Sequence, residues 1–442
     1  MPRAIGYPDC GIIADPYAAA LPQGSSVKKL AALLASLALA LVTAGCGGSK
    51  GSPADYPKDF KVTAGDTAVV ITWTAEPEVE YWLFYGRGTN ITTTNWVSQG
   101  GSAIAKVTSP YVLTRLTNGQ VYSFTINGRK DGGPGGDGAP TQVATPQLAG
   151  GNWSAGEPMG TGNLNGAASG AGGAALNTYL TMVVGDGGTI YSRNVLGTTT
   201  TPTNPSAPAR LNAVAFGTAG WVAVGDGGTS VGSVDGETWT AKPTSVTANL
   251  HGISPSPLGG YIATGAAGTI LLGSTAATWT PATSSGTTND LRAALYGNAR
   301  YVAVGAAGTV VTGTDGLNWT VSPSGTTADL RGLAYAGLAT TTDGVTTTVY
   351  HYVAVGKGGT VLHSNDALTW TTVAPFTTKD LNAVIYGGQF VAVGSGGGIF
   401  TSPDGLTWTA RNSGTTADLN AIARTQAGYS VVGTGGTIVS SF

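Results

Sequence analysis

The sequence predicts an all-β protein in which a small β-sandwich precedes a seven-bladed β-propeller. A pattern of about forty residues recurs seven times between residues 164 and 442. A period of this length, with several short apolar runs in each copy, is typical of four-stranded blades arranged in a ring. The 442-residue chain also has 70 glycines and only 10% charged residues, which favours strands and tight turns over helices.

The first fifty residues carry an export signal. Lys28 and Lys29 precede a mostly apolar run from Leu30 to Val42, which is too short to span a bilayer but suits a signal-peptide core. The run ends in Thr43-Ala44-Gly45-Cys46, which resembles the lipobox of bacterial lipoproteins, although Thr43 stands where leucine is commonest. The resemblance implies cleavage before Cys46 and acyl chains on that residue, because several chains hold a protein firmly at a membrane. The alternative is an ordinary cleaved signal with an incidental cysteine.

These features divide the N-terminal part of the chain. We expect residues 1–26 to be a misannotated extension, with translation starting at Val27 from a GTG codon. Residues 27–45 would be the lipoprotein signal peptide and 46–53 a short tether. The tether has glycine and serine but no aspartate after Cys46, which looks like an outer-membrane sorting signal. Whether the protein faces the periplasm or the cell surface stays open.

Residues 54–147 are predicted to form the sandwich. Short runs with aromatic and β-branched residues alternate with turn residues over about ninety positions. The segment resembles a fibronectin type III domain through Trp73, Tyr81 and the motif Leu116-Thr-Asn-Gly119-Gln-Val-Tyr122. In that family the motif is a tyrosine corner, whose phenol binds back to the chain, and such modules of exported bacterial proteins are mostly spacers. The glycine-rich run from Asp131 to Gly138 is expected to be a hairpin loop.

Residues 148–442 are predicted to form the propeller, with four strands per copy. In the second copy the strands would be Leu211–Phe216, Trp221–Gly225, Thr229–Ser233 and Thr238–Thr240, from the axis outwards. Trp153 precedes the first copy at the spacing at which the other repeat tryptophans precede their next leucine, and the last copy stops before its own tryptophan. A strand at 152–154 is therefore expected to complete blade seven and close the ring, which removes a free sheet edge.

The element Ser-x-Asp-Gly-x-Thr-Trp recurs at Ser233 to Trp239 and Ser402 to Trp408. It resembles the Asp-box of BNR-repeat propellers, and the repeats are also similar to those of photosystem II assembly-factor propellers. The resemblance implies the fold. It does not imply one function, because sialidases, sugar-binding proteins and assembly factors all carry such boxes.

The residues on either side of the seven opening leucines are expected to surround the mouth of the central channel. The candidate ligand-binding residues among them are Asn212, His251, Asp290, Arg292, Asp329, Arg331, Asp380, Asn382, Asp418 and Asn420. Because the neighbours of a strand residue share a face, Asp290 with Arg292 and Asp329 with Arg331 are predicted to be able to pair. The set could bind a sugar or a peptide, or its members could cap loop backbones and one another.

Other function classes have less support. The formal net charge of -2 offers no basic face for nucleic acid. His251, His351 and His363 lack metal-ligand spacing, so no metal and no cofactor is expected. A sialidase-type exo-glycoside hydrolase would need an arginine triad, a tyrosine activated by a carboxylate and a separate acid. The Phe-Arg-Ile-Pro sequence that accompanies the first of those arginines in sialidases is absent, and Glu157 and Glu237 are the two glutamates of the propeller sequence. We therefore expect a monomeric, non-enzymatic binding or scaffolding lipoprotein with an unknown protein or glycan partner. A glycoside hydrolase and an assembly factor for a membrane complex are the alternatives.

Overall fold

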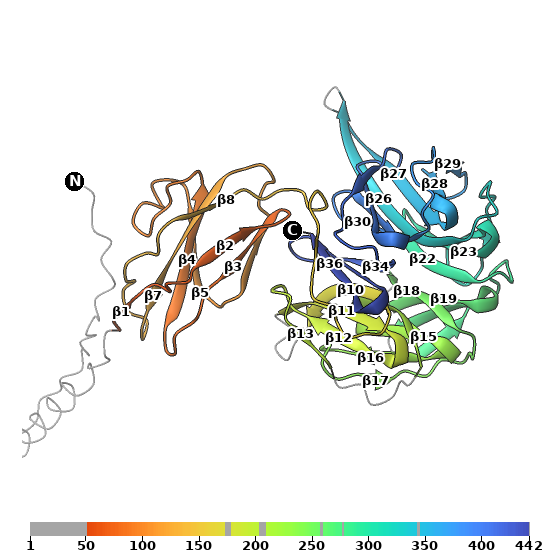
Figure 1. Ribbon diagram of the computed structural model, residues 1–442, viewed down its shortest axis with the longest axis horizontal. Helices are drawn as coiled ribbons and strands as arrows, with labels where there is room; N and C mark the ends of the chain where they lie inside the picture. Colours follow the sequence, from red (N-terminus) through yellow and green to blue (C-terminus); the bar gives the residue numbers. More distant parts are fainter. Residues whose placement is uncertain are drawn as a thin grey trace, which may run out of the picture.

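The computed structural model describes residues 51–441 except 173–177, 203–208, 257–259, 276–277 and 343–344. The predicted extension, the signal peptide and the lipidation site Cys46 lie outside the described residues. Within the described part, no helix is long and apolar enough to cross a membrane. The fold is all-β as predicted, with a two-sheet sandwich beside a propeller of seven four-stranded sheets (Figure 1).

Two sheets of unequal size form the sandwich. The larger sheet contains β1 (Pro53–Ala54), β4 (Glu80–Arg87), β5 (Ser102–Val107), β7 (Tyr122–Arg129) and β8 (Gln142–Ala144). The smaller sheet contains β2 (Lys61–Ala64), β3 (Ala68–Thr72) and β6 (Tyr111–Thr114). Alternate residues such as Tyr81, Leu83, Phe124 and Ile126 face the core between the sheets, which is what the period of a strand requires.

Two local features of the sandwich bear on the sequence predictions. The tyrosine corner is present, because the backbone N–H of Thr117 donates to Oη of Tyr122 at 3.1 Å. The end of the predicted tether, however, belongs to the sandwich. Pro53 pairs with Arg129, and Ser52 exchanges two backbone hydrogen bonds with Lys130. These residues satisfy an edge of β7 that would otherwise be unpaired.

The propeller is built from seven antiparallel sheets, each running from the axis outwards. Blade one contains β10 (Leu164–Gly172), β11 (Thr178–Gly185), β12 (Ile190–Arg193) and β13 (Thr199–Thr200). Blade two contains β14 (Leu211–Gly217), β15 (Gly220–Gly225), β16 (Ser230–Ser233) and β17 (Thr240–Ala241). Blade three contains β18 (Leu250–Ser256), β19 (Gly260–Gly265), β20 (Ile270–Thr275) and β21 (Thr278–Pro281). Blade four contains β22 (Leu291–Gly297), β23 (Arg300–Gly305), β24 (Val310–Gly313) and β25 (Thr320–Val321).

The last three blades follow the same plan. Blade five contains β26 (Leu330–Thr342), β27 (Val345–Gly356), β28 (Val361–Ser364) and β29 (Thr371–Thr372). Blade six contains β30 (Leu381–Tyr386), β31 (Phe390–Gly394), β32 (Gly398–Ser402) and β33 (Thr409–Arg411). Blade seven contains β34 (Leu419–Arg424), β35 (Tyr429–Gly433), β36 (Ile438–Ser441) and β9 (Ser154–Ala155). The hairpin β26–β27 is the longest and projects from the ring (Figure 1).

Each blade has a 3-10 turn between its second and third strands. The turns are η1 (Asp186–Gly188), η2 (Asp226–Gly228), η3 (Ala266–Gly268), η4 (Ala306–Gly308), η5 (Lys357–Gly359), η6 (Ser395–Gly397) and η7 (Thr434–Gly436). The second strands are buried on both faces, as in Trp221 to Gly225, because neighbouring blades stack on them. Their continuous Val-Ala-Val runs follow from this position.

The Asp-box closes the hairpin between the third and outer strands. In blade two, Oδ1 of Asp235 accepts the backbone N–H groups of Glu237 and Thr238 at 2.8 and 3.0 Å. Oγ of Ser233 accepts the N–H of Gly236, and Nε1 of the fully buried Trp239 donates to the carbonyl of Gly236. The tryptophan thus stabilises the turn, and β17 starts after it, two residues later than predicted.

Blade seven builds the corresponding turn from the two ends of the propeller sequence, with Ala149 at the position of the box aspartate. Ser154 and Ala155 of β9 pair with Ser440 and Val439 of β36. The N–H of Gly150 donates to Oγ of Ser441 at 2.8 Å, and Nε1 of Trp153 donates to the carbonyl of Gly150. These two bonds repeat those of Gly236 with Ser233 and Trp239. The predicted closing strand therefore lies slightly further along the chain than 152–154, and Trp153 completes the turn beside it.

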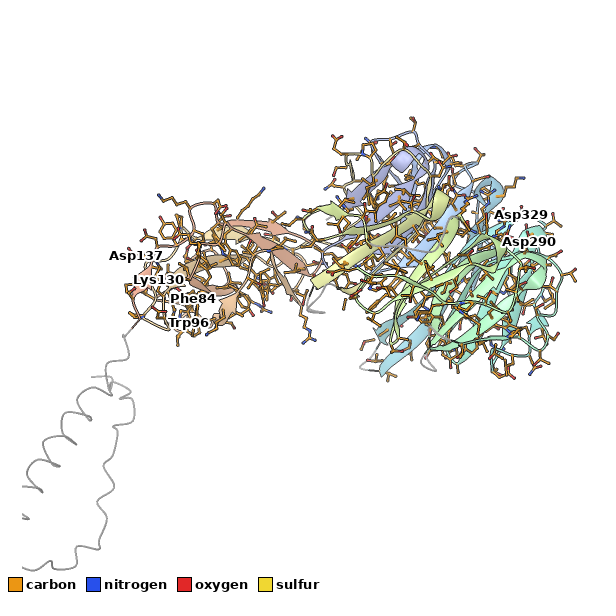
Figure 2. All side chains as sticks on the ribbon, turned by 90° about the horizontal axis from the view of Figure 1, so that it is seen from below. Phe84, Trp96, Lys130, Asp137, Asp290 and Asp329 are labelled. Carbon is orange, nitrogen blue, oxygen red and sulfur yellow. The ribbon has the colours of Figure 1, made fainter. Side chains whose placement is uncertain are left out.

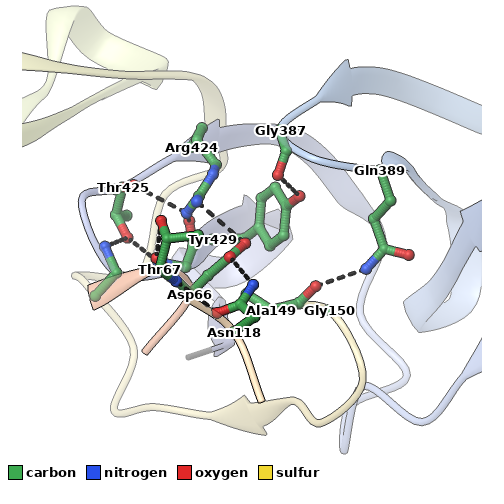
Figure 3. A network of polar contacts seen from close by, with 12 residues as sticks. Asp66, Thr67, Asn118, Ala149, Gly150, Gly387, Gln389, Arg424, Thr425 and Tyr429 are labelled. Carbon is green, nitrogen blue, oxygen red and sulfur yellow. Dashed lines mark hydrogen bonds and ion pairs between the residues drawn. The ribbon is translucent and has the colours of Figure 1, made fainter. Parts of the chain in front are cut away.

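The sandwich is docked on blade seven (Figure 3). Oδ2 of Asp66 lies 3.1 Å from Nη2 of Arg424, and the N–H of Asp66 donates to the carbonyl of Ala427. Ala68 and Val70 of β3 pack on Ala427 in a small apolar cluster between the two domains. Charge pairing, backbone bonding and apolar contact therefore all act at this junction.

Candidate functional site

The seven inner strands surround a central channel with a cavity volume of about 340 Å³. Its wall is lined by small and aliphatic residues of these strands, and by the residue that follows each opening leucine. Those seven residues are Asn165, Asn212, His251, Arg292, Arg331, Asn382 and Asn420. The six predicted site residues that are not aspartates thus meet at one cavity. Among the described residues, no aspartate or glutamate lines it.

The residues before the leucines serve the turns of the preceding blade. Oδ1 of Asp290, Asp329, Asp380 and Asp418 each accepts one backbone N–H, from Ala267, Ala307, Gly358 and Gly396 respectively, at 2.8 to 3.0 Å. Asn249 accepts the equivalent bond from Gly227, and Asn163 accepts one from Gly435 across the closure. The residues before the leucines therefore connect each blade to the previous one. In the four predicted site aspartates, one carboxylate oxygen is already occupied by this hydrogen bond.

The asparagines after the leucines form a second connection around the ring. Nδ2 of Asn165, Asn212, Asn382 and Asn420 donates to the carbonyl of the next blade's leucine, which is Leu211, Leu250, Leu419 and Leu164 respectively, at 2.9 to 3.0 Å. An asparagine at this position therefore satisfies a backbone carbonyl close to the channel. This asparagine ladder spans four of the seven junctions.

The ladder is interrupted at three consecutive blades. Blades three, four and five carry His251, Arg292 and Arg331 at the ladder position. Nη1 of Arg331 donates to Oδ1 of Asn382 at 2.7 Å and lies 3.1 Å from Oδ2 of Asp380. Nε2 of His251 lies 3.9 Å from Oδ2 of Asp290, beyond hydrogen-bonding distance. Arg292 makes no ion pair with a described residue, and its Nε is buried without a hydrogen-bond partner.

The predicted pairing of neighbouring charges was wrong. Asp290 does not pair with Arg292, nor Asp329 with Arg331, among the described residues. The reason is a β-bulge at each leucine: Leu330 pairs with Gly356, and Gly332 pairs with the next residue back, Val355. Arg331 is the extra residue of the bulge, so the residues around Leu330 do not share a face as they would in a regular strand. Arg331 reaches the next blade instead.

The electrostatics of the interrupted sector favour a bound anion. Burial lowers the pKa of His251, and the positive charge of Arg292 lowers it further. The backbone N–H of Gly358 and the guanidinium of Arg331 lower the pKa of Asp380 although burial opposes them. His251 is therefore a neutral hydrogen-bonding group near pH 7, and Arg292 is a cation whose charge no described carboxylate neutralises at contact distance.

The structure assigns the other histidines differently from the sequence. His351 and His363 lie side by side on neighbouring strands of blade five, with Nδ1 of His351 2.9 Å from Nε2 of His363. Their register makes them diagonal cross-strand neighbours, a relationship that needs the strand pairing to be known. Among the described residues, no group of three or more histidine, cysteine, aspartate or glutamate side chains is placed to hold a metal ion.

A larger hollow lies elsewhere. Its volume is about 750 Å³, and it is lined mainly by Gly268 to Leu271 of blade three and by the serine- and threonine-rich segment from Pro281 to Asn289 that leads into blade four. No charged side chain lines it. The channel is smaller, but it is lined by arginine, histidine and asparagine side chains, which can make charged and neutral hydrogen bonds to a ligand.

Comparison with known proteins supports the fold. No model of a protein family matches this sequence, and no curated protein matches it significantly. The structure of YCF48 bound to D1 peptide has a TM-score of 0.51 and 17% identity, and covers 65% of this chain and 96% of that chain. YCF48 from Cyanidioschyzon merolae has a TM-score of 0.50 and 14% identity, covering 65% and 98%. An inactive virginiamycin B lyase from Staphylococcus aureus with quinupristin has a TM-score of 0.55 and 11% identity, covering 66% and 98%. The neighbours are β-propellers.

Proposed function

We propose that the propeller is a non-enzymatic binding module that recognises a protein partner through an anionic group, such as a carboxylate, at the channel mouth. The interruption of the asparagine ladder supports this proposal most strongly. Repeat symmetry alone would place an asparagine at all seven junctions, and four asparagines do bind the next blade. The positions in blades three, four and five depart from this pattern, and Arg292 in blade four has no partner of opposite charge among the described residues.

The form of the channel fits the end of a peptide chain. A guanidinium binds carboxylates through two parallel hydrogen bonds, and the apolar wall below Arg292 can receive a small aliphatic side chain. The solved structure of YCF48 with a peptide gives a precedent for peptide binding by a propeller of similar fold. A glycan remains the second ligand class for the same site.

An array of peptides with free and with amidated C-termini, together with glycans, tests the proposal. We expect wild-type protein to bind a subset of the free-carboxylate peptides. Arg292→Ala should weaken this binding at least about tenfold, because a hydrogen bond to a charged group contributes about 1.5–3 kcal/mol. Arg115→Ala, which removes an exposed arginine of the sandwich, is the matched control. Equal binding by wild type and Arg292→Ala would contradict the proposal.

The proposal of binding without catalysis rests on the aspartates. A paired-carboxylate hydrolase needs free carboxylates, whereas Asp290, Asp329 and Asp380 each accept a turn N–H. Turnover of chromogenic glycosides is the test. Activity that disappears in Asp329→Asn would establish the glycoside hydrolase instead.

We also propose that Cys46 anchors the protein to a membrane, with the sandwich as a fibronectin type III-like spacer. The lipobox-like sequence and the tyrosine corner support these two points. The anchor is tested by fractionation: Cys46→Ser should move the protein from the membrane to the soluble fraction. Retention of the variant in the membrane fraction would argue against lipidation. Co-purification of one stoichiometric membrane-protein partner would support an assembly role.

A further inference from the structure

The outer face of the larger sandwich sheet is aromatic, although the outer face of a two-layer sandwich is usually polar. Tyr81 and Leu83 of β4 point into the core, so Trp82 and Phe84 lie on the opposite face. Phe84 is nevertheless only 4% exposed. Its ring lies 5.8 Å from that of Trp96, which comes from the connection between β4 and β5. This face is therefore covered by other parts of the chain.

Two loops cover the face and leave a groove between them. The loop after β4 is attached to β7 by the bond from the N–H of Ile91 to Oγ of Ser123. The glycine-rich loop after β7 lies on the sheet from the other side, and a Cβ at Gly135 would come within 2.1 Å of Nδ2 of Asn127. Glycine at this position thus lets the loop approach β7 without displacing the Asn127 side chain. The remaining groove has a volume of about 670 Å³ and is lined by Trp82, Thr93, Trp96, Asn127, Arg129 and Asp137, among others.

Three buried polar atoms of residues that line this groove have no hydrogen-bond partner in the part of the chain that the structure describes. They are Oδ1 of Asn127, Nε of Arg129 and Nε1 of Trp82. Asn127 is only 3% exposed, and the guanidinium of Arg129 lies 3.8 Å over the ring of Trp82. Nearly all buried polar groups in folded proteins are paired, and these three unpaired ones belong to residues that line the same groove. A small movement of these side chains on binding would let a ligand in the groove supply their partners. That ligand must offer at least one donor and two acceptors.

We propose that this groove binds a neutral oligosaccharide. A sugar hydroxyl both donates and accepts hydrogen bonds, which matches the acceptor of Asn127 and the donors of Arg129 and Trp82. The apolar face of a sugar ring can pack on the half-buried indole of Trp96. The groove wall carries the carboxylates of Asp55 and Asp137 and one guanidinium, so it offers no positive excess for a phosphate-rich ligand.

The topology disfavours a peptide in the same place. An extended peptide binds by adding a strand to a free sheet edge. The groove lies over β4 and β7, and both strands already have a partner on each side. Recognition there must therefore come from side chains. The groove is also remote from the propeller residues Asp290 and Asp329 (Figure 2), so this proposal does not depend on the function proposed for the channel.

Calorimetric titration of the full-length protein with neutral hexasaccharides of glucose, xylose and N-acetylglucosamine tests the inference. We expect at least one of them to bind with a dissociation constant in the micromolar to millimolar range. Trp96→Ala should weaken binding at least tenfold and Trp96→Phe should weaken it less. The neighbouring Val97→Ala, at a side chain that is 69% exposed, should bind as wild type.

Two further measurements keep the result interpretable. Arg115→Ala, at an exposed residue of the sandwich that lines neither the groove nor the channel, should leave sugar binding unchanged. Asp137→Ala provides a second groove variant if Trp96→Ala lowers the melting temperature. The proposal is overturned if no neutral sugar binds wild type at millimolar concentration, if neither groove variant weakens binding, or if the groove binds only peptides.

Discussion

Asp66 of the sandwich and Arg424 of the propeller form an ion pair of 3.1 Å across the domain junction. The Asp66 side chain is 3% exposed and that of Arg424 is 29% exposed. Oδ1 of Asp66 also accepts a hydrogen bond from Nδ2 of Asn118 at 2.8 Å, and the guanidinium lies 5.1 Å from the ring centre of Tyr429. A charge buried this far is stabilising only while its partner stays in place.

Removing this charge should loosen the domain junction. Asp66→Asn keeps the shape of the side chain but leaves Arg424 half-buried without its counter-ion, which we expect to cost about 2–3 kcal/mol of docking free energy. Small-angle X-ray scattering should show a larger radius of gyration, and protease should cleave near residues 145–150 more rapidly. Glu76→Gln, at an exposed carboxylate of the same sandwich, is the control. An unchanged scattering curve for Asp66→Asn would show that the backbone and apolar contacts are sufficient.

The asparagine ladder predicts opposite effects at equivalent positions. Asn420→Ala leaves the carbonyl of Leu164 without its donor across the closure and should lower the free energy of unfolding by about 1–2 kcal/mol. Arg292→Asn restores the repeat residue opposite Leu330 and should raise it by about 0.5–1 kcal/mol. Urea unfolding measures both. Stabilisation by Arg292→Asn with loss of ligand binding would show that the interruption serves function; destabilisation by this variant would argue against a ladder.

The blade-seven turn formed by the two ends of the propeller sequence predicts how firmly the ring is closed. Trp153 is partly exposed and stacks on Tyr429 with ring centres 5.9 Å apart. Trp153→Ala should cost about 2 kcal/mol, less than the roughly 3–5 kcal/mol expected for Trp239→Ala at a fully buried box tryptophan. Hydrogen exchange should become faster in β36 for Trp153→Ala and in β16 for Trp239→Ala. Equal exchange in β36 of wild type and Trp153→Ala would show that the β9–β36 pairing closes the ring without the indole.

The histidine pair predicts weaker folding at mildly acidic pH. Burial lowers the pKa of both His351 and His363 from the ordinary 6.5, and the charge of one opposes protonation of the other at His363. The unfolded chain therefore binds protons more readily than the folded protein. The contribution of the pair to the free energy of unfolding is complete above about pH 6.5 and decreases as the pH falls below this value. His363→Gln should flatten the dependence between pH 7 and 5 in urea titrations. His251→Gln, a variant of a histidine outside this pair, should retain most of the slope in that range; an equal flattening would contradict the assignment.

Most of the fold was predictable because repetition carries it. The seven leucines and the Val-Ala-Val-Gly runs indicate strand number and blade number without any knowledge of long-range contacts. The repetition also predicted that the channel residues form a ring. It did not predict the partners of Arg331, because a single bulged residue changes the face on which a side chain lies.

One sequence pattern indicated the sandwich groove, but the interpretation of this domain as a spacer did not take it into account. Tyr81 to Tyr85 is a continuous run of large apolar residues, and such a run indicates a strand buried on both faces. A two-layer sandwich buries only one face of each sheet, so the run implied a cover over the second face. The unpaired atoms of Asn127 and Arg129 depend on loop placement, which the sequence pattern does not determine.

The pairing of β9 with β36 in blade seven, here called the seam, determines how a pulling force is transmitted through the molecule. A pull on the N-terminus of the described chain passes through the sandwich and the short connection at Gln147 to Gly150, and then reaches the two-residue pairing of β9 with β36. The bond from Gln389 to the carbonyl of Ala149 and the ion pair of Asp66 lie ahead of that seam. They carry part of the load into blades six and seven directly, so the ring is shielded from being peeled open at its weakest strand.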